Sequence, residues 1–422
     1  MTSTRAHAAP GDATRLGGVE AQGATARSVT AIHHNPAMLG ALEETQFHTS
    51  VSSGLDQRWI RRDAIDSSGF PTGSADTRIS LLNPTFSYFA GASVYLEPFA
   101  LGAAVYSVGN SFQLTSGDPL RYHLAPGLEN LPGRCVGRSE RACSLGGSAT
   151  YRTDFSLAFA WSVLTDLNIG IGVHFPRLRT RFAYDNSSVL SDSDRQGECT
   201  NVEDPACSER VAFSGRTRWL PASGTKLPGF DLALTLGLAY QVSSRVTLGI
   251  RYRTRPLLRS GNLQLSGQVV ICRPDESTGQ SGDAPACSVA EPVDATLLER
   301  IPQELSVGLG VVLGRGKQWR IDGTALWVDH CHDVDGDPGI ANCGDPGSQQ
   351  LNLIGLETSR VLLSDSVRYR GHQDLFGLDI YTTYQARSNL GVSVAGHFSS
   401  PSIQRAAMSA SAADSWRVGF SF

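Results

Sequence analysis

The sequence predicts an all-β fold: a transmembrane antiparallel up-and-down β-barrel of 12 to 14 strands, with an N-terminal segment in its lumen. Three observations predict it. Short runs alternate apolar residues with small or polar ones, long and short connections between these runs alternate along the chain, and the last run ends on the aromatic residue Phe422. Strands of outer-membrane barrels carry this period of two, because successive side chains point to opposite faces.

The clearest alternating run covers residues 229–240. Its odd positions hold Gly, Asp, Ala and Thr, and its even positions are all large and apolar: Phe230, Leu232, Leu234, Leu236, Leu238 and Tyr240. Such a strand turns one face to lipid and the other to a hydrated or ligand-filled lumen. The runs 155–163, 304–311 and 390–395 repeat the pattern.

In chain order, twelve strands are expected: 44–57, 84–96, 99–112, 149–163, 167–183, 227–242, 245–268, 298–313, 317–330, 365–384, 388–399 and 414–422. Short connections at 97–98, 165–167, 243–244, 314–316 and 386–387 alternate with long polar segments. Outer-membrane barrels have short periplasmic turns and longer exterior loops, so both termini are expected in the periplasm.

Composition excludes several classes of protein. A soluble chain of 422 residues is usually two or three domains, yet a barrel of this length can be a single one. No stretch approaches the roughly 18 to 20 consecutive apolar residues of a membrane helix, and the mean hydropathy of -0.14 is too polar for a helical bundle in lipid. The net charge of -4, with no basic cluster, gives no indication of a nucleic-acid partner.

The eight cysteines form four neighbouring pairs, each in or beside a long polar segment: Cys135 with Cys143, Cys199 with Cys207, Cys272 with Cys287, and Cys331 with Cys343. An even number with close partners indicates disulfides that staple exterior loops in an oxidising compartment. Zinc sites favour two to four residues between paired ligands, and these spacings are longer. No metal site is therefore expected. The acidic run 333–337 resembles a calcium loop, but Pro338 and the missing closing glutamate break that pattern.

The N-terminal residues 1–43 do not alternate. Asn35-Pro36-Ala37 is typical of a helix start, since Asn is a good N-cap and Pro suits the first helical position; a capped turn is the alternative. Residues 1–10 contain no apolar signal-peptide core, although Ala6-His7-Ala8 resembles the end of a signal peptide. The recorded start then lies inside or after a leader, or else this stretch is simply disordered.

The chain resembles the long-chain fatty acid transport family of outer-membrane proteins, the FadL/TodX type. The matching segments are the Gly-rich approach 17–24 and Asn35-Pro36-Ala37, followed by 300–310, 319–322 and 395–401. The resemblance implies a hatch formed by residues 1–43, carrying Asn35, Pro36 and Ala37, inside a barrel formed by residues 44–422. It further implies passive uptake of long-chain fatty acids or other hydrophobic compounds across the outer membrane of a Gram-negative bacterium, with no cofactor.

In that family a break in the third strand opens a lateral window toward the membrane. Glycine inside a strand often marks a bulge or kink, which makes Gly102 and Gly109 the kink candidates. Two features depart from the family pattern: its barrels usually have fourteen strands, and cysteine-stapled loops are not a general property of it.

Three arginines at inward positions are candidate ligand-binding residues: Arg251, Arg253 and Arg320. An arginine binds a fatty-acid carboxylate through paired hydrogen bonds; the alternative is that these residues form an ion-pair network in the lumen. His33 and His34, beside the hatch motif, are also expected near the lumen.

Two other classes of function remain open at this stage. One is a structural or receptor barrel whose exterior loops bind a partner. The other is a barrel-embedded lipid hydrolase, which needs a Ser or Asp working with a His. His48, His174 and His397 have no serine or acid partner at motif spacing, so no catalytic residue is expected.

Overall fold

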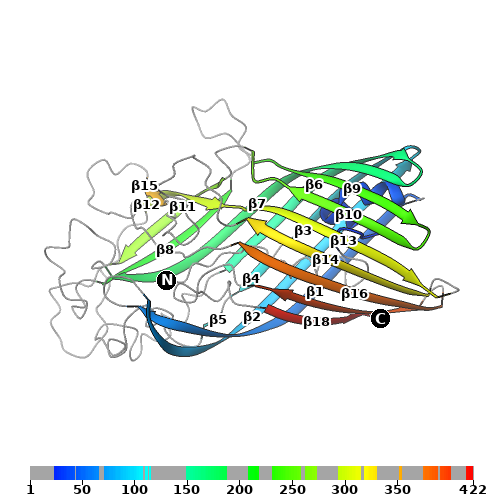
Figure 1. The fold of residues 1–422 in the computed structure, drawn as a ribbon. Coiled ribbons are helices and arrows are strands. Elements are labelled where there is room, and N and C mark those ends of the chain that lie inside the picture. Colours follow the sequence, from blue (N-terminus) through cyan, green and yellow to red (C-terminus); the bar gives the residue numbers. More distant parts are fainter. Residues whose placement is uncertain are drawn as a thin grey trace, which may run out of the picture.

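The computed structural model describes residues 23–42, 44–65, 71–107, 110–112, 114–115, 149–187, 208–217, 231–257, 262–272, 293–314, 318–329, 351–353, 374–387, 390–400 and 415–421. The fold is all-β apart from two short helical elements near the N-terminus (Figure 1). Neither of these described helices is long and apolar enough to cross a membrane.

The helices are α1 (Ala31–His34) and the 3-10 helix η2 (Pro36–Ala41). The strands are β1 (Gln46–Ile65), β2 (Pro71–Leu96), β3 (Phe99–Ser107), β4 (Asn110–Phe112), β5 (Leu114–Thr115), β6 (Ala149–Leu164), β7 (Leu167–Ser187), β8 (Ser208–Thr217), β9 (Ala233–Ser243), β10 (Val246–Arg253), β11 (Asn262–Cys272), β12 (Val293–Arg300), β13 (Gln303–Leu313), β14 (Trp319–Asp329), β15 (Leu351–Leu353), β16 (Leu375–Arg387), β17 (Leu390–Ser399) and β18 (Ser415–Ser421).

All strands belong to one antiparallel meander. At the end with the short turns, neighbours pair in the order β1, β2, β3, β6, β7, β9, β10, β13, β14, β16, β17 and β18. Each of these corresponds to one strand expected from the sequence. The up-and-down order is thereby confirmed. In the part of the chain that the structure describes, no pairing joins β18 to β1, so closure of the sheet is not seen.

Toward the end with the long loops, the neighbour of a long strand is made of two separate strands. β9 pairs with the first part of β7 and β8 with its last part, and β10 and β11 follow them in the same way. β13 and β12 continue this arrangement on the next line. The pieces that lie toward the long loops form an extension of the sheet beyond its central part (Figure 1).

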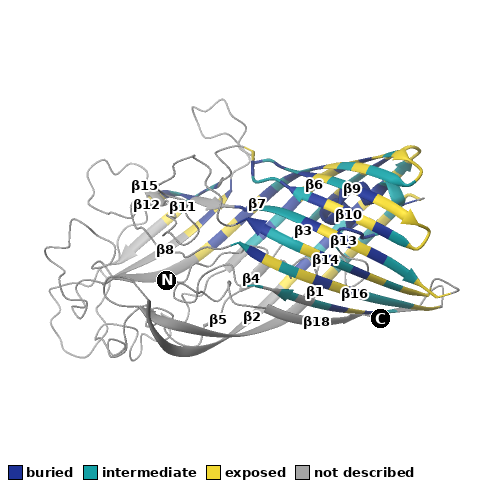
Figure 2. Cartoon of the chain, viewed as in Figure 1, coloured by how far each residue is buried: buried dark blue, intermediate teal, exposed yellow. Residues whose placement is uncertain are grey.

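Burial alternates along the central strands (Figure 2). Exposed apolar side chains cover the convex face, among them Phe159 on β6, Ile171 on β7 and Leu309 on β13. Small and polar side chains cover the concave face, where Ser156, His174 and Thr235 are buried. The greasy outer face and polar inner face are those that the period of two predicts.

Aromatic residues gather at the short-turn end of the convex face, where Phe99 packs against Phe159 and Trp161, and Trp319 against Tyr384. Girdles of this kind mark the membrane interface of barrels.

Two predicted loops are wrong in part. The expected connection 58–83 is largely strand, since β1 and β2 pair from Gln46 with Ser93 up to Ile65 with Pro71. The expected loop after residue 183 contains β8, which pairs with both β7 and β11. Strands that extend beyond the lipid need no apolar face, so their sequence lacks the alternation that identified the others.

Candidate functional site

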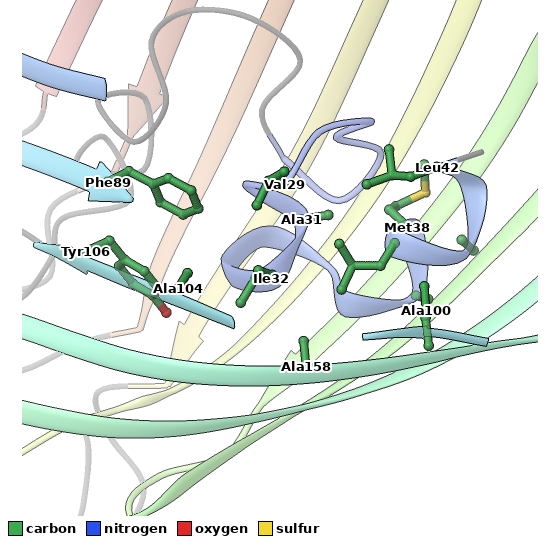
Figure 3. Close-up of a cluster of buried hydrophobic side chains, with 14 residues drawn as sticks. Val29, Ala31, Ile32, Met38, Leu42, Phe89, Ala100, Ala104, Tyr106 and Ala158 are labelled. Atoms are coloured by element: carbon green, nitrogen blue, oxygen red, sulfur yellow. The ribbon is translucent and has the colours of Figure 1, made fainter. Parts of the chain in front are cut away.

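The segment 23–42 lies on the concave face of the sheet. Its buried apolar side chains pack against Phe89 of β2, Tyr106 of β3, Ala158 of β6 and Ala239 of β9; they are Val29, Ala31, Ile32, Ala37, Met38, Leu39 and Leu42 (Figure 3). Hydrogen bonds join the segment to β9, β10 and β14: Asn35 to Leu238, Arg27 to Thr247, and Thr25 to Asp322. Because these strands follow one another around the sheet, the segment is held from several sides of the concave face.

Asn35 is the hub of the segment. Its side-chain amide donates to the carbonyl oxygens of Ala24 and Leu238, at 2.7 and 3.1 Å, and its Oδ1 accepts from the backbone N–H of Ala37 at 3.2 Å. Asn35 is fully buried and caps η2, with Pro36 in the first turn. The predicted cap and helix start at Asn35-Pro36-Ala37 are confirmed, and the helix is a 3-10 helix.

Three glycines make room for this motif. A Cβ on Gly170 would collide with the backbone at Pro36 and Ala37, and one on Gly237 would collide with Asn35 Oδ1. A Cβ on Gly249 would collide with the Ala24 carbonyl. Glycine permits this approach of segment to strand because it has no side chain. We call Gly170, Gly237 and Gly249 the glycine cradle.

A second set of contacts holds the start of the segment on β14. Thr25 Oγ1 donates to Asp322 Oδ1 at 2.7 Å, and Arg320 donates to the Thr25 carbonyl at 2.6 Å. Arg320 also makes two bonds to Asp322, at 2.6 and 2.8 Å. Arg320 therefore bonds to the segment and to Asp322. Its assignment as a ligand-binding residue stays a prediction.

The other two arginine candidates lie in a buried ion-pair network on the concave face. Asp154 Oδ2 accepts from Arg253 at 2.6 Å, and the same carboxylate takes two bonds from Arg152 at 2.9 Å. Arg251 pairs with Glu304 at 2.7 Å. The alternative interpretation, a network of ion pairs, thus describes the contacts of both candidates. Sequence reasoning missed Asp154, Arg152 and Glu304. Asp154 and Glu304 pair with Arg253 and Arg251 of β10, which is distant from them in the chain, whereas Arg152 lies two residues from its partner Asp154 on β6.

His174 lies beside this network with a hydroxyl on each ring nitrogen. Its Nδ1 is 2.6 Å from Ser156 Oγ and 3.1 Å from Tyr106 Oη, and its Nε2 is 2.7 Å from Thr235 Oγ1. The structure thus gives His174 a serine partner that spacing did not indicate. No carboxylate among the described residues bonds to this ring, and Ser156 is buried.

His33 and His34 of α1 face the network from the segment. The His33 ring contacts Tyr106 edge to face at 4.9 Å. Burial, reinforced by Arg251, lowers the pKa of His34 to about 3. Burial and the nearby His34, Arg251 and Arg253 also hold the pKa of His33 well below its ordinary value. Both histidines are therefore neutral at neutral pH.

Four buried donor or acceptor atoms in this region have no hydrogen-bond partner: Arg251 Nε, Arg253 Nε, His33 Nδ1 and His34 Nε2. Buried polar atoms are satisfied in the great majority of cases, and exceptions call for an explanation. Within the described residues no group of His, Cys, Asp and Glu is arranged to hold a metal ion.

The register of the third strand runs through Gly102 without a bulge, and a kink at this residue stays a prediction. Gly102 pairs with Ser93 on one side and Ala158 on the other, in an unbroken register, and its missing side chain makes room for Ile32 and Leu39.

The third strand does change register farther along. Tyr106 pairs with Phe89 and Asn110 with Phe86, which leaves one extra residue on the third strand between them. The pairing with β6 shifts by the same amount, from Ser107 with Thr153 to Ser111 with Thr150. One extra residue against both neighbours is the mark of a β-bulge. Gly109 itself lies outside the described residues.

Most of the cysteine prediction also falls outside the described residues. This applies to Cys135, Cys143, Cys199, Cys207, Cys287, Cys331 and Cys343, while Cys272 is described only as the last residue of β11. The acidic run 333–337 lies outside them as well.

Comparison with solved structures identifies the fold. A FadL homologue of Pseudomonas aeruginosa superposes with a TM-score of 0.59 at 13% identity, over 93% of this chain and 80% of the other. The chain has the FadL-type barrel fold. The Ralstonia pickettii toluene transporter TbuX gives a TM-score of 0.52 at 16% identity, over 92% and 85% of the two chains. The Pseudomonas putida toluene transporter TodX gives 0.52 at 13% identity, over 89% and 79%.

No protein-family model matches the sequence, and no curated protein matches it. The FadL-type fold therefore rests on structural likeness, and the sequence similarity to these channels is low throughout.

Proposed function

We propose that this chain is an outer-membrane transporter for passive uptake of long-chain fatty acids or other hydrophobic compounds. In this proposal residues 1–43 are the hatch and residues 44–422 the barrel, with exterior loops stapled by the four cysteine pairs. The observation that carries it is the seat of segment 23–42, which contacts strands around the concave face through the glycine cradle and the Asn35 and Thr25 hydrogen bonds. The FadL homologue and the toluene transporters that share its fold add support.

The chemistry of the concave face supports a ligand with an anionic head. Arg251 and Arg253 each carry a buried Nε–H without a partner, and both lie beside α1. A carboxylate accepts strong hydrogen bonds from guanidinium donors. We assign Arg251 and Arg253 to the head of the ligand, and the apolar cluster around Ile32, Phe89 and Tyr106 to its tail.

Uptake in cells tests the proposal. A strain lacking the gene is compared with the same strain carrying it, using radiolabelled oleate and radiolabelled toluene. We expect the protein to raise the initial rate for at least one of the two several-fold. Equal rates with and without the protein, for both compounds, would contradict transport.

The ligand assignment has its own test on purified protein in detergent. Arg251→Gln is expected to weaken binding of oleate about 10- to 150-fold, because one charge-assisted hydrogen bond of roughly 1.5–3 kcal/mol is lost. Binding of oleyl alcohol, which has the same tail and no carboxylate, should stay within twofold. An equal loss for both compounds would show that the substitution disturbs the binding site as a whole and that Arg251 does not recognise the carboxylate.

A further inference from the structure

An arginine cluster continues the outer face of β7 beyond its apolar part. The outward positions of β7 read Ile169, Ile171, Val173 and Phe175, and then Arg177, Arg179 and Arg181, all three of them exposed. On the neighbouring strand β8, Arg216 is exposed as well. We call Arg177, Arg179, Arg181 and Arg216 the outer arginine patch.

The height of the patch matches the edge of a membrane. From Leu167 at the short turn to Phe175 is eight steps along β7, or about 27 Å of strand. A tilt of about 40° turns this into a height of about 20 Å, close to the roughly 25 Å apolar band of outer-membrane barrels. Arg177 therefore lies where hydrocarbon gives way to headgroups. It lies toward the long loops, because the turn between β6 and β7 is one of the short ones.

The patch has a like-charge pair at its centre. Arg179 and Arg216 are directly opposite one another in the register of β7 and β8, and both side chains are exposed on the same face. Like charges directly opposite on neighbouring strands destabilise a sheet. Beyond Phe175, the outward positions of β6, β7 and β8 whose side chains are described carry no Asp or Glu. An anion at this point offsets the repulsion.

We propose that the outer arginine patch binds the phosphorylated headgroup of a lipid in the leaflet that faces the long loops. Arginine suits this task, because its planar guanidinium binds phosphate through two parallel hydrogen bonds. The acyl chains of such a lipid would lie along the apolar outer face of β6 and β7, next to Phe155, Leu157 and Ile171. The inference rests on the proposed outer-membrane location and is independent of transport through the lumen.

A binding experiment on the purified full-length chain in zwitterionic detergent tests it. The probes are diphosphorylated lipid A, the same lipid without its phosphates, and inorganic phosphate, each titrated with native mass spectrometry as the readout. The variant replaces all four arginines by glutamine, and the control is Arg245→Gln, an exposed arginine at the short turn between β9 and β10. We expect the Kd for diphosphorylated lipid A to rise at least tenfold in the fourfold variant and to stay within twofold in R245Q.

Three results would overturn the proposal. They are unchanged binding in the fourfold variant, equal affinity of the wild type for the lipid without phosphates, and displacement of the lipid by inorganic phosphate at similar concentration. If the fourfold variant does not fold, the double variant Arg179→Gln with Arg216→Gln replaces it, with heat-modified gel migration as the check of folding. Without lipid we expect this double variant to be at least as heat-stable as the wild type, since the repulsion is gone. With diphosphorylated lipid A only the wild type should gain stability.

Discussion

At the scale of single residues, the packing of segment 23–42 against the sheet depends on glycines, which have no side chain. A Cβ on Gly237 would collide with Asn35 Oδ1 and lie 3.1 Å from the Pro36 ring. Asn35 cannot retreat without losing its bonds to the Ala24 and Leu238 carbonyls. The glycine cradle therefore couples the concave face of the sheet to Asn35-Pro36-Ala37.

Gly237→Ala is expected to loosen the segment, because overpacking of a closely fitted contact costs about 1–3 kcal/mol. Amide hydrogen exchange over residues 24–38 measures this directly, and we expect it to accelerate about 5- to 100-fold. The matched control is Gly323→Ala on β14, where an added Cβ has no neighbour within 4 Å. Equal exchange in both variants would mean that the close approach at Gly237 does not matter.

Asp154 is the residue on which the concave ion-pair network depends, since it accepts from both Arg152 and Arg253. Asp154→Asn leaves two buried cations without their carboxylate, and breaking a buried pair in this way costs about 3–5 kcal/mol. We expect a clear fall in the temperature at which the barrel unfolds, followed by heat-modified gel migration. Asp294→Asn, at an exposed position of β12, should leave that temperature unchanged; an unchanged temperature in D154N would show that the network adds little stability.

At the scale of elements, α1 places two neutral histidines against cationic strands. His33 faces Arg251 and Arg253 of β10, His174 of β7 and Tyr106 of β3, and His34 faces Arg251. A proton on either histidine adds a buried positive charge beside these arginines. The packing of α1 against these strands is therefore expected to weaken at low pH.

The sign of that dependence follows from the lowered pKa values. A released segment takes up protons below about pH 6.5, whereas seated His34 does so only near pH 3. Acidification from pH 7 toward pH 4 thus weakens the seat, by up to about 1.4 kcal/mol per pH unit and per histidine. Hydrogen exchange of residues 31–34 should accelerate at low pH beyond the intrinsic trend, and the double variant His33→Gln with His34→Gln should remove that excess. A wild type without the excess contradicts this prediction.

The elements also show what the sequence reveals and what it does not. Strands such as β9 (Ala233–Ser243) could be predicted, because a residue's outward or inward position follows from its own neighbours in the chain. β8 and the outer part of the β1–β2 hairpin could not, because strands that extend beyond the lipid have no need of an apolar face. The site could be predicted only where its contacts lie within a few residues in the chain. Asn35, for example, caps the helix that starts at the next residue. The partnership of Asp154 with Arg253 depends on register between distant strands, which no local pattern contains.

At the scale of the whole molecule, the alternation along the strands gives the sheet two chemically different faces. Exposed apolar side chains form the convex face, polar and ionic side chains the concave face, and segment 23–42 lies within. The long polar connections start from strand ends on one side of the sheet. In the sequence, seven of the eight cysteines fall in these connections. The direction of the molecule in its membrane decides whether those connections reach the exterior.

Epitope insertion in cells tests that direction. One tag is placed after Gly314, in the short turn between β13 and β14, where Gly314 has a φ of +89°; the other is placed at residue 201, between β7 and β8. Short turns of outer-membrane barrels face the periplasm, so antibody should bind the tag at residue 201 on intact cells and the tag at Gly314 only after permeabilisation. Uptake of the labelled compounds by both tagged proteins confirms that each is folded. Labelling at Gly314 on intact cells would show that the molecule has the opposite orientation in the membrane. The outer arginine patch would then not lie in the leaflet that faces the exterior.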